Sequence, residues 1–503
     1  MTTQTGTAAG TAPTEYGALV STHPATGAEL GRYVIDDAKS VGAAVRRARE
    51  AQAWWGSLTF AQRRHHLLSC RANLAHQVKD MVMALRTETG KSVSDAVTEI
   101  VTCLDHMAWA AKNAKRVLGA RRVPTSLTMF DHAAHLEYQP FGVVGVIGPW
   151  NYPLFTPMGS IIYALAAGNT VVFKPSEFTP GVGQKIADLI CNTVGAPIVS
   201  AVHGFGDVGE LVCRADVDKI AFTGSYPTAK KVAHAAADRL VPALIEGGGN
   251  DAAIVAADAN LRSAASHVLW SSMTNAGQSC VGIERVYVVD SVADEFVDRL
   301  VDGAKELQVG SGDDAQIGPI TIAKQLDVIR GHIDDALDRG GTAVLGGRGA
   351  IDPPYVHPTI LCDVPDDSKA ATEETFGPVL IVNRVADTDE ALHRANTVGF
   401  RLGGAVFGGS DSMRLARGMR SGMVAINSGF AFAGIPRLPF GGVGASGYGR
   451  AHGDDGLREF AVAKSIARRR LPQLLPTMTM QRKPVHNKAF QGYVKLRSRR
   501  RPD

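Results

Sequence analysis

The chain has 503 residues, 45% of them apolar and 20% charged, which is typical of a globular protein with two or three domains. Its net charge of +4 is unevenly spread, because residues 464–503 hold twelve Lys or Arg and one acid. No apolar stretch approaches the ~20 residues of a membrane-spanning helix, and residues 1–12 lack the features of a signal peptide, so we expect them to be disordered. Six scattered cysteines without a CxxC pair indicate a reducing, cytoplasmic location rather than a disulfide framework.

The first quarter of the chain is predicted to be helical. Ala, Val and Leu recur every three or four residues through 41–55, 63–85 and 97–117. The pattern then changes, because polar and apolar residues alternate over 132–138 and a continuous apolar run occupies 142–147. The alternation is typical of a strand, and the continuous run predicts a buried strand with a loop after it.

Two series of strands and helices follow. Short apolar runs alternate with helical stretches, which predicts βαβ units and a parallel sheet with helices on both faces. A glycine cluster at 247–250 separates this series from a second α/β series, which begins at 286–289 and continues to about 440. The short apolar runs of the first series and the boundary region are 170–173, 197–202, 219–222 and 252–255.

The last 33 residues, 471–503, are basic and poor in aromatic residues. A solvated, unstructured tail is the favoured interpretation of this composition. Contact with an anionic membrane surface is the alternative, and no specific nucleic-acid partner is expected.

Two segments fit the dinucleotide fingerprint G-x-G-x-x-G. The fingerprint requires a strand before it and a helix after it, because the amino end of the helix holds a pyrophosphate. Residues 204–209 meet this requirement, whereas 442–447 have no helical pattern after them and are predicted to form a glycine turn.

Cys280 stands in a small polar segment, Asn275-Ala-Gly-Gln-Ser-Cys280, rather than in an apolar one. This setting favours a nucleophilic cysteine over a buried structural one. Lys174 and Glu177 follow a predicted strand, where they are either ligands of a ribose or an ordinary charged pair in a loop. No triplet of His or acidic residues is spaced for a metal ion, so no metal site is expected.

Nine sequence blocks, in order, resemble the aldehyde dehydrogenase superfamily, and the resemblance covers about residues 21–467. Nine blocks in family order make a chance resemblance very improbable. The blocks are Gly148–Pro153 (GPWNYP), Leu165–Thr170 (LAAGNT), Val171–Glu177 (VVFKPSE), Ala221–Ser225 (AFTGS), Ile245–Gly249 (IEGGG), Asn275–Cys280 (NAGQSC), Pro358–Leu361 (PTIL), Glu373–Pro378 (EETFGP) and Pro439–Gly442 (PFGG).

The resemblance implies oxidation of an aldehyde to a carboxylic acid. Cys280 matches the nucleophile, which forms a thiohemiacetal and then a thioester. Asn151 matches the side-chain amide that, with the Cys280 backbone N–H, stabilises the oxyanion. Glu246 matches the general base that activates water to hydrolyse the thioester.

The resemblance also implies a nicotinamide cofactor, with the pyrophosphate beside Ser225 and the adenosine ribose against Lys174 and Glu177. Glu374 and Phe376 match contacts to the nicotinamide ribose and ring. A carboxylate at Glu177 accepts bonds from both ribose hydroxyls and repels a 2′-phosphate, which favours NAD over NADP, although relatives with this Lys-Pro-Ser-Glu block use both. The remaining candidate cofactor contacts are Ile147, Trp150, Ser176, Gly206 at the adenine end, Phe222, Gly224 and Gly247.

The implied fold is α/β, with a Rossmann-like parallel-sheet cofactor domain, a second α/β catalytic domain and a small β oligomerisation element. By the resemblance the protein is a homodimer or a homotetramer. The expected ranges are 1–123 and 141–247 for the cofactor domain, 248–445 for the catalytic domain, 124–140 and 456–470 for the oligomerisation strands, and 471–503 for the basic tail.

The chain departs from the family pattern at three places. The usual Glu-Leu-Gly-Gly-Lys is Glu246-Gly-Gly-Gly-Asn250 here, which we expect to loosen the backbone after Glu246. The usual glycine after Phe-Thr-Gly-Ser is replaced by Thr228-Ala229, and the basic tail extends beyond the usual end of the family.

Gly159 bears on the substrate. It stands where semialdehyde enzymes often carry an Arg that pairs with the distal carboxylate, so an uncharged aliphatic or aromatic aldehyde is favoured. Glu246 argues against a CoA-acylating enzyme, which generally lacks the deacylating base, and a binding protein without turnover is the alternative from another class. The candidate residues of the substrate tunnel are Phe155, Ser279, Val281, Phe430 and Phe432.

Overall fold

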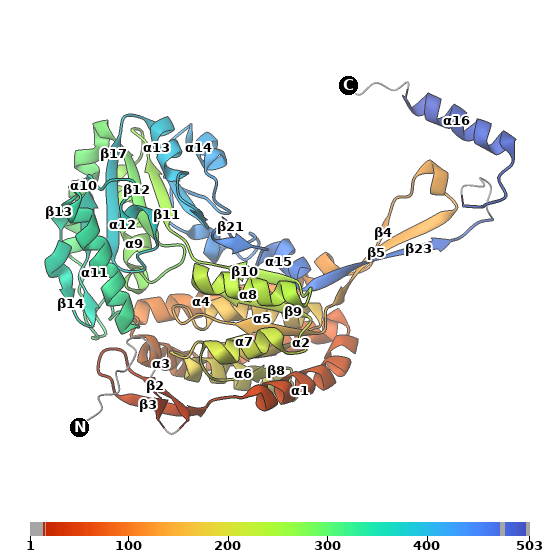
Figure 1. Ribbon diagram of the computed structural model, residues 1–503, viewed down its shortest axis with the longest axis horizontal. Coiled ribbons are helices and arrows are strands. Elements are labelled where there is room, and N and C mark those ends of the chain that lie inside the picture. Colours follow the sequence, from red (N-terminus) through yellow and green to blue (C-terminus); the bar gives the residue numbers. More distant parts are fainter. Residues whose placement is uncertain (1–13, 16, 473–477, 499–503) are drawn as a thin grey trace.

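Two mostly parallel sheets form the framework of the computed structural model, which describes residues 14–15, 17–472 and 478–498 (Figure 1). The first sheet has the strand order β22-β10-β9-β6-β7-β8, and the second has the order β13-β16-β17-β12-β11-β19-β20. Only the edge strands β22 and β13 run antiparallel to their neighbours. The predicted α/β class is therefore confirmed, whereas the lead-in at 1–12 lies outside the described residues.

The first sheet is covered on both faces because its strands are apolar on both sides. Val144 and Val146 of β6 face a core shared with α2, α4, α5, α6 and α15, whereas Val143 and Ile147 face α1, α7 and α8. The strands are β6 (Val143–Ile147), β7 (Thr170–Lys174), β8 (Val199–Ala201), β9 (Lys219–Thr223), β10 (Ala243–Glu246) and β22 (Gly447–Tyr448). The helices are α1 (Ala38–Ser57), α2 (Phe60–His76), α3 (Val78–Thr89), α4 (Val93–Leu118), α5 (Phe155–Ala167), α6 (Pro180–Val194), α7 (Gly206–Arg214), α8 (Tyr226–Asp238) and α15 (Gly453–Glu459).

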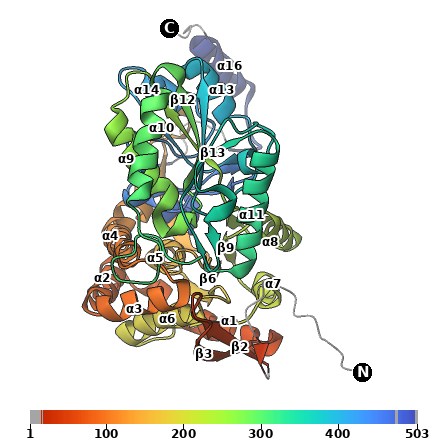
Figure 2. The ribbon, with the colours of Figure 1, turned by 90° about the vertical axis from the view of Figure 1, so that its left-hand side faces the viewer.

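The second sheet lies beside the first, as Figure 2 shows from the side. Its larger core contains α9, α10, α11 and α12, and its other face packs on α13 and α14. The strands are β11 (Asp251–Val255), β12 (Ile283–Val289), β13 (Thr342–Leu345), β16 (Thr359–Cys362), β17 (Val379–Val385), β19 (Gly404–Phe407) and β20 (Ala425–Ile426). The helices are α9 (Leu261–Met273), α10 (Asp290–Lys305), α11 (Ala323–Asp338), α12 (Lys369–Thr372), α13 (Thr388–Ala395) and α14 (Ser412–Gly418).

Small strands complete the body. The described part of the chain begins in an antiparallel sheet that the sequence did not predict, and the Ser21 hydroxyl of this sheet donates to the Glu88 carboxylate at 2.7 Å. The segment 442–447 contains the predicted turn, flanked by two-residue strands. These short strands are β1 (Thr14–Glu15), β2 (Ala18–Thr22), β3 (Glu29–Val34), β14 (Ile351–Asp352), β15 (Tyr355–Val356), β18 (Phe400–Arg401) and β21 (Val443–Gly444).

The predicted helix at 63–85 is two helices. Gln77, with φ −94° and ψ 20°, ends α2 and precedes α3. The apolar spacing continues across this break because both helices pack against α4, so the periodicity could not reveal it.

A three-stranded antiparallel sheet projects from the body as an arm (Figure 1). It consists of β4 (Arg121–Val123), β5 (His132–Pro140) and β23 (Ala461–Arg469). The expected boundary at residue 123 is wrong, because β4 pairs with β5 and belongs to the arm. The expected strand at 456–470 is too long, because residues 456–459 belong to α15, which packs on α4 and α5.

The basic tail contains a helix, α16 (Pro484–Ser498), at the end of the arm (Figure 1). The expectation of an unstructured tail is therefore wrong for these residues, while 473–477 and 499–503 lie outside the described part. None of the residues of α16 is buried. In the described ranges, no helix is both long and apolar enough to cross a membrane.

Candidate active site

The carboxyl ends of β6 and β9 mark the point where the strand order of the first sheet reverses. From β6 the chain passes to β7 and β8 on one side, and it then returns to β9 and β10 on the other. Ligands of open parallel sheets bind at such a switch point. Asn151 follows β6, Gly224 and Ser225 follow β9, and Glu246 ends the neighbouring β10.

Cys280 follows a tight turn at the end of α9. Asn275 and Ala276 have φ angles of 53° and 55°, in the left-handed region that non-glycine residues seldom adopt. Gly277 has φ 71°, and a Cβ there would lie 2.1 Å from the Gly377 carbonyl oxygen, so only glycine fits. The turn is fixed by Asp95, whose carboxylate accepts from the backbone N–H of Asn275 at 3.1 Å.

Asn151 is held beside this turn. Its side-chain Nδ2 donates to the Gln278 carbonyl at 3.0 Å, and its own carbonyl accepts from Asn275 Nδ2 at 3.0 Å. An amide has two N–H groups and this bond uses one, so the other is available to an oxyanion.

A fully buried ion pair holds the loop that contains Asn151 in place. Lys91 Nζ lies 2.5 Å from Glu99 Oε2 and donates to the Asn151 carbonyl at 2.8 Å. Glu99 Oε1 accepts from the backbone N–H groups of Leu154 and Phe155, at 2.9 and 3.0 Å, at the start of α5. Sequence reasoning missed this pair, because nothing in the spacing of Lys91 and Glu99 connects them with residues 151–155.

Cys280 and Glu246 line one cavity, in which the two side chains influence each other's ionisation. Burial raises the pKa of Glu246, and Thr223 Oγ1 donates to its Oε2 at 3.4 Å. Burial, followed by the Glu246 charge, raises the pKa of Cys280 well above its usual value. Among the described residues Glu246 Oε1 has no hydrogen-bond partner, so this oxygen is available to a water molecule.

Further buried carboxyl groups surround Cys280. Burial raises the pKa of Asp251 to about 8 and that of Glu284 to about 7. Burial and the Glu284 charge raise the pKa of Glu374 well above its usual range. Glu284 accepts from the backbone N–H of Phe376 at 2.9 Å, and Glu374 accepts from that of Gly249 at 2.8 Å. Such a cluster favours a bound cation, which fits the charged ring of an oxidised nicotinamide.

The residues after Glu246 that differ from the family pattern have local structural reasons. A Cβ at Gly247 would lie 2.8 Å from the Ala445 carbonyl, and the Gly247 N–H donates to the Ser446 carbonyl at 3.1 Å. Asn250 accepts from the buried Arg285 at both its carbonyl, 2.8 Å from Nη2, and its side-chain oxygen, 2.5 Å from Nε. The segment after Glu246 is therefore anchored by hydrogen bonds at both ends, which gives no support to the expected loosening.

The other candidate cofactor contacts lie at the ends of β6, β7 and β9. Lys174 Nζ lies 3.3 Å from the partly exposed Glu177 Oε2, which also accepts from Ser176 Oγ at 3.4 Å. Ser225 precedes α8 without capping it, and its hydroxyl instead contacts that of Thr228 at 3.1 Å. The first turn of α8 is thus left without a side-chain cap, which suits a phosphate.

The remaining candidates are placed as follows. The rings of Trp150 and Phe376 meet edge to face at 5.5 Å, and open space surrounds Gly206 at the start of α7. Ile147 ends β6, Phe222 lies in β9, and a Cβ at Gly224 would lie 2.7 Å from the Phe222 ring. In the described part of the chain, no three His, Cys, Asp or Glu side chains are grouped to hold a metal ion.

The cavity at Cys280 has a volume of about 230 Å³ and is mostly apolar. Four candidate tunnel residues line it, namely Phe155, Ser279, Val281 and Phe430. Phe432 does not, which corrects that prediction: its ring is buried in the hydrophobic cluster that also contains Val281, against Gly403.

His452 occupies the space over Gly159, where a Cβ would lie 2.7 Å from His452 Nε2. The His452 ring lies 4.1 Å from that of His106, centroid to centroid. Burial lowers the pKa of His106 to about 4 and that of His452 well below its usual value, so both rings are neutral at pH 7. Each has a buried Nδ1 without a partner among the described residues.

Comparison with known proteins agrees with the resemblance. The Aldehyde dehydrogenase family model matches residues 12–466, so the chain belongs to the aldehyde dehydrogenase family. A Mycobacterium ulcerans (strain Agy99) protein, provisionally named succinate-semialdehyde dehydrogenase (NADP+) 2, is 35% identical over 462 residues, which are 90% of this chain and 89% of that protein.

Two further relatives are informative. The 4,4′-diapolycopene aldehyde oxidase of Methylomonas sp. is 35% identical over 463 residues, covering 90% of this chain and 87% of the relative. A solved structure of a Mycobacterium tuberculosis aldehyde dehydrogenase complexed with NAD+ has a TM-score of 0.86 and 30% identity. It covers 92% of this chain and 96% of that one.

Proposed function

We propose that the protein oxidises an uncharged aliphatic or aromatic aldehyde to its carboxylic acid with NAD(P)+, through a thioester on Cys280. The observation that carries the proposal is that Cys280 and Glu246 line the same mostly apolar cavity, with Asn151 held beside the turn that precedes Cys280. A nucleophile, a base and an oxyanion donor are the groups this reaction needs.

Each step uses one of these groups. The Cys280 sulfur attacks the carbonyl carbon, and the thiol proton passes to the Glu246 carboxylate. The resulting oxyanion accepts hydrogen bonds from the Asn151 amide and the Cys280 N–H. When bound, the nicotinamide accepts a hydride from that carbon. Glu246 releases the thiol proton to solvent, and its carboxylate then removes a proton from the water that hydrolyses the thioester, for which its raised pKa suits it.

We place the cofactor along the ends of β6, β7 and β9, with Lys174 and Glu177 at the adenosine ribose and Ser225 at the pyrophosphate. The carboxylate of Glu177 favours NAD, while the proximity of Lys174 and the NADP in the name of a relative keep NADP as the second candidate. The carboxyl groups of Glu374, Glu284 and Asp251 would favour the cationic ring.

The substrate class rests on the inner end of the tunnel. The described residues that line the tunnel include neither Lys nor Arg, and His452 and His106 are neutral. A distal carboxylate would therefore lose its hydration without gaining an ion pair, which is costly. We therefore do not propose succinate semialdehyde, which the name of the Mycobacterium ulcerans relative contains, as the substrate of this chain. The aldehyde in the name of the Methylomonas relative fits the apolar lining of the tunnel better.

The test is formation of the reduced cofactor, followed by its absorbance, with a panel of aldehydes and with NAD and NADP in parallel. We expect turnover of uncharged aldehydes in the absence of CoA, little turnover of succinate semialdehyde, and none with Cys280→Ala. Activity that survives in Cys280→Ala, or no turnover of any aldehyde, would overturn the proposal.

We further propose that the arm of β4, β5 and β23 joins copies of the chain into a homodimer or homotetramer. Its strands project from the body, and Val462 and Ile466 on β23 are 44% and 39% exposed. Light scattering on the full chain and on a chain ending at residue 460 tests this, since loss of the last strand should give a monomer. We also place the protein in the cytoplasm, in keeping with its six free cysteines.

For α16 we propose contact with an anionic membrane surface. Lys488, Lys495 and Arg497 lie on this helix together with Val485, Val494 and Leu496, which are 63–69% exposed. Pelleting with phosphatidylserine vesicles should occur at low salt and disappear at high salt or on deletion of 471–503. Equal pelleting with neutral vesicles, or none, would contradict the proposal.

A further inference from the structure

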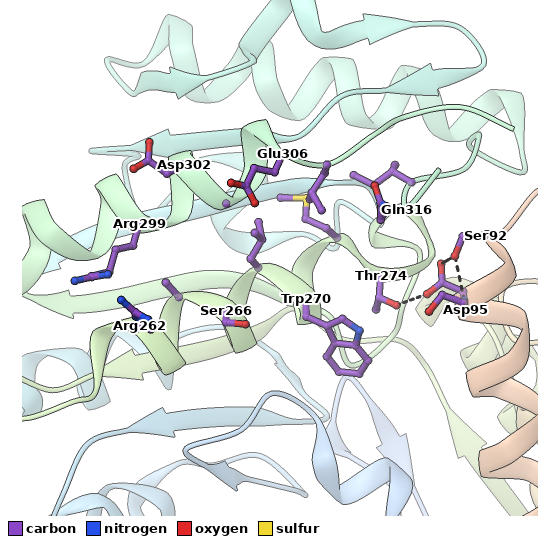
Figure 3. Close-up of a pocket in the computed structure, with 17 residues that line it drawn as sticks. Ser92, Asp95, Arg262, Ser266, Trp270, Thr274, Arg299, Asp302, Glu306 and Gln316 are labelled. Carbon is purple, nitrogen blue, oxygen red and sulfur yellow. Dashed lines mark hydrogen bonds between the residues drawn. The ribbon is translucent and has the colours of Figure 1, made fainter. Parts of the chain in front are cut away.

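The tunnel at Cys280 adjoins an outer cleft. The cleft, of about 530 Å³, is lined mainly by α9 and α10 and by the start of α4 (Figure 3). Asp95, Trp270 and Thr274 line both cavities. Because the same three side chains border the two spaces, the tunnel and the cleft lie next to each other at this point.

One side of the junction is rigid. Asp95 accepts from Ser92 Oγ at 2.8 Å and from Thr274 Oγ1 at 2.6 Å, the bonds drawn in Figure 3. Thr274 begins the turn that carries Cys280, so this border stands in a constant position relative to the nucleophile.

The other side of the junction is aromatic. The ring of Trp270 packs on that of Phe430 with 4.6 Å between centroids and an interplanar angle of 35°. Trp270 is 47% exposed, although a tryptophan is usually mostly buried, and Phe430 lines the tunnel. An apolar chain leaving the tunnel would therefore pass from Phe430 to Trp270 without losing apolar contact.

The lining of the cleft continues this apolar path. The apolar residues that line the cleft are Ala265, Leu269, Met273, Leu307 and Ile317. Arg262 and Arg299 stand at the end away from Asp95 (Figure 3), and Asp302 and Glu306 also line the cleft. These four side chains carry charges of both signs, and Arg299 is paired with Glu295 at 2.7 Å. The cleft therefore does not select an ionic ligand.

We propose that this cleft is a second substrate subsite, which takes the distal part of unbranched apolar aldehydes too long for the tunnel, with Trp270 as the contact between the two spaces. The inference rests on the proposed aldehyde oxidation at Cys280. It adds a preference for long chains, because each methylene moved out of water strengthens binding by up to about fourfold.

The test compares KM across unbranched aldehydes from propanal to dodecanal. Ser266 is exposed and lines the cleft, so Ser266→Trp fills the cleft without disturbing the core. We expect KM of the wild type to fall with chain length, and Ser266→Trp to raise KM for dodecanal by about tenfold or more, equivalent to roughly two buried methylenes, while leaving propanal unchanged. Trp270→Ala should act in the same direction.

Trp54→Ala is the matched control, because Trp54 is similarly exposed, at 42%, on α1 and lines neither cavity. Equilibrium dialysis of decan-1-ol with Cys280→Ala, and with this variant combined with Ser266→Trp, measures binding of an apolar chain in the absence of turnover. Weaker binding with Ser266→Trp supports the subsite. If short aldehydes are turned over and KM depends on chain length equally in all variants, the subsite is overturned and the proposed function stands. If no aldehyde is turned over, the proposed function is overturned, and the dialysis alone then tests whether the cleft binds an apolar chain.

Discussion

Among single residues, Cys280 has the most unusual surroundings, because its thiol is buried among carboxyl groups. Both burial and the charge of Glu246 oppose its ionisation. A site of this kind holds its nucleophile as a thiol until the local charge changes, and the neighbouring carboxyl is placed to accept the proton.

This predicts the pH dependence of alkylation by iodoacetamide. The Cys280 thiol should react slowly at neutral pH, with a midpoint above its usual pKa of 9.0. Glu246→Gln removes a negative charge beside the sulfur, so the thiolate is favoured and the midpoint should move to lower pH. The signal of Cys280→Ala gives the contribution of the other cysteines, and an unchanged midpoint would contradict this account.

Replacing Asn151 is predicted to lower kcat strongly and the free energy of unfolding only slightly. Asn151→Ala should lower kcat by about 10²–10³, the usual effect of losing one oxyanion donor. Its hydrogen bond to the Gln278 carbonyl contributes only about 1 kcal/mol to stability. Asn73→Ala is the control, since that amide bonds Thr193 Oγ1 at 2.9 Å between α2 and α6. Equal losses of kcat in both variants would contradict a specific role.

At the scale of elements, the start of α4 is the support on which the active-site loops rest. Lys91, just before the helix, and Glu99 within it together hold the Asn151 carbonyl and the amino end of α5. Asp95, one turn before Glu99, holds the turn that leads to Cys280. One helix end thus sets the relative positions of two candidate catalytic segments, at Asn151 and Cys280, that are more than a hundred residues apart in the chain.

Breaking the buried ion pair is therefore expected to be costly. Lys91→Met leaves the Glu99 charge buried without its partner and should lower the free energy of unfolding by about 3–5 kcal/mol in urea titrations. The double variant Lys91→Met/Glu99→Gln removes both charges while keeping an acceptor for the Leu154 and Phe155 N–H groups, so it should recover much of that loss. A single variant that loses less than the double variant would contradict this explanation.

For the whole molecule, the buried acids determine how stability depends on pH. Asp251 and Glu284 have folded-state pKa values of about 8 and about 7, above their usual values of 3.8 and 4.5. The folded protein therefore retains protons that the unfolded chain releases, and stability falls as pH rises towards 8. His106 and His452 act in the opposite sense, since their lowered pKa values penalise folding only below about pH 6.5.

Between about pH 7.5 and pH 8 the histidines of the unfolded chain, whose usual pKa is 6.5, have largely lost their protons, so the effect of the acids dominates. The free energy of unfolding should fall with pH there, by at most about 1.4 kcal/mol per pH unit for each retained proton. Asp251→Asn keeps an acceptor for the Gly403 N–H, which lies 2.9 Å from Oδ1, and removes the titration, so its slope should be shallower. Urea titrations across this range provide the measurement, and equal slopes for the two proteins would refute the assignment.

The sequence by itself determined the α/β class, the positions of most strands and the family. These are local properties: periodicity reports which face of an element is apolar, and blocks such as Asn275–Cys280 and Gly148–Pro153 are contiguous. The roles of Cys280, Glu246 and Asn151 also come from such blocks, and they stay predictions until the variants are measured.

Only the tertiary structure decided which distant residues meet. The support of Asn151 by Lys91, the imidazole of His452 over Gly159, and the acids around Cys280 depend on how the two sheets and α4 pack, and no local spacing encodes them. The errors at Gln77 and at 456–459 also have tertiary causes, because α2 and α3 both pack on α4, and residues 456–459 belong to a helix that packs on α4 and α5. The adjacency of tunnel and cleft at Trp270 likewise exists only in the folded chain, because the shared lining comes from segments that the sequence keeps far apart.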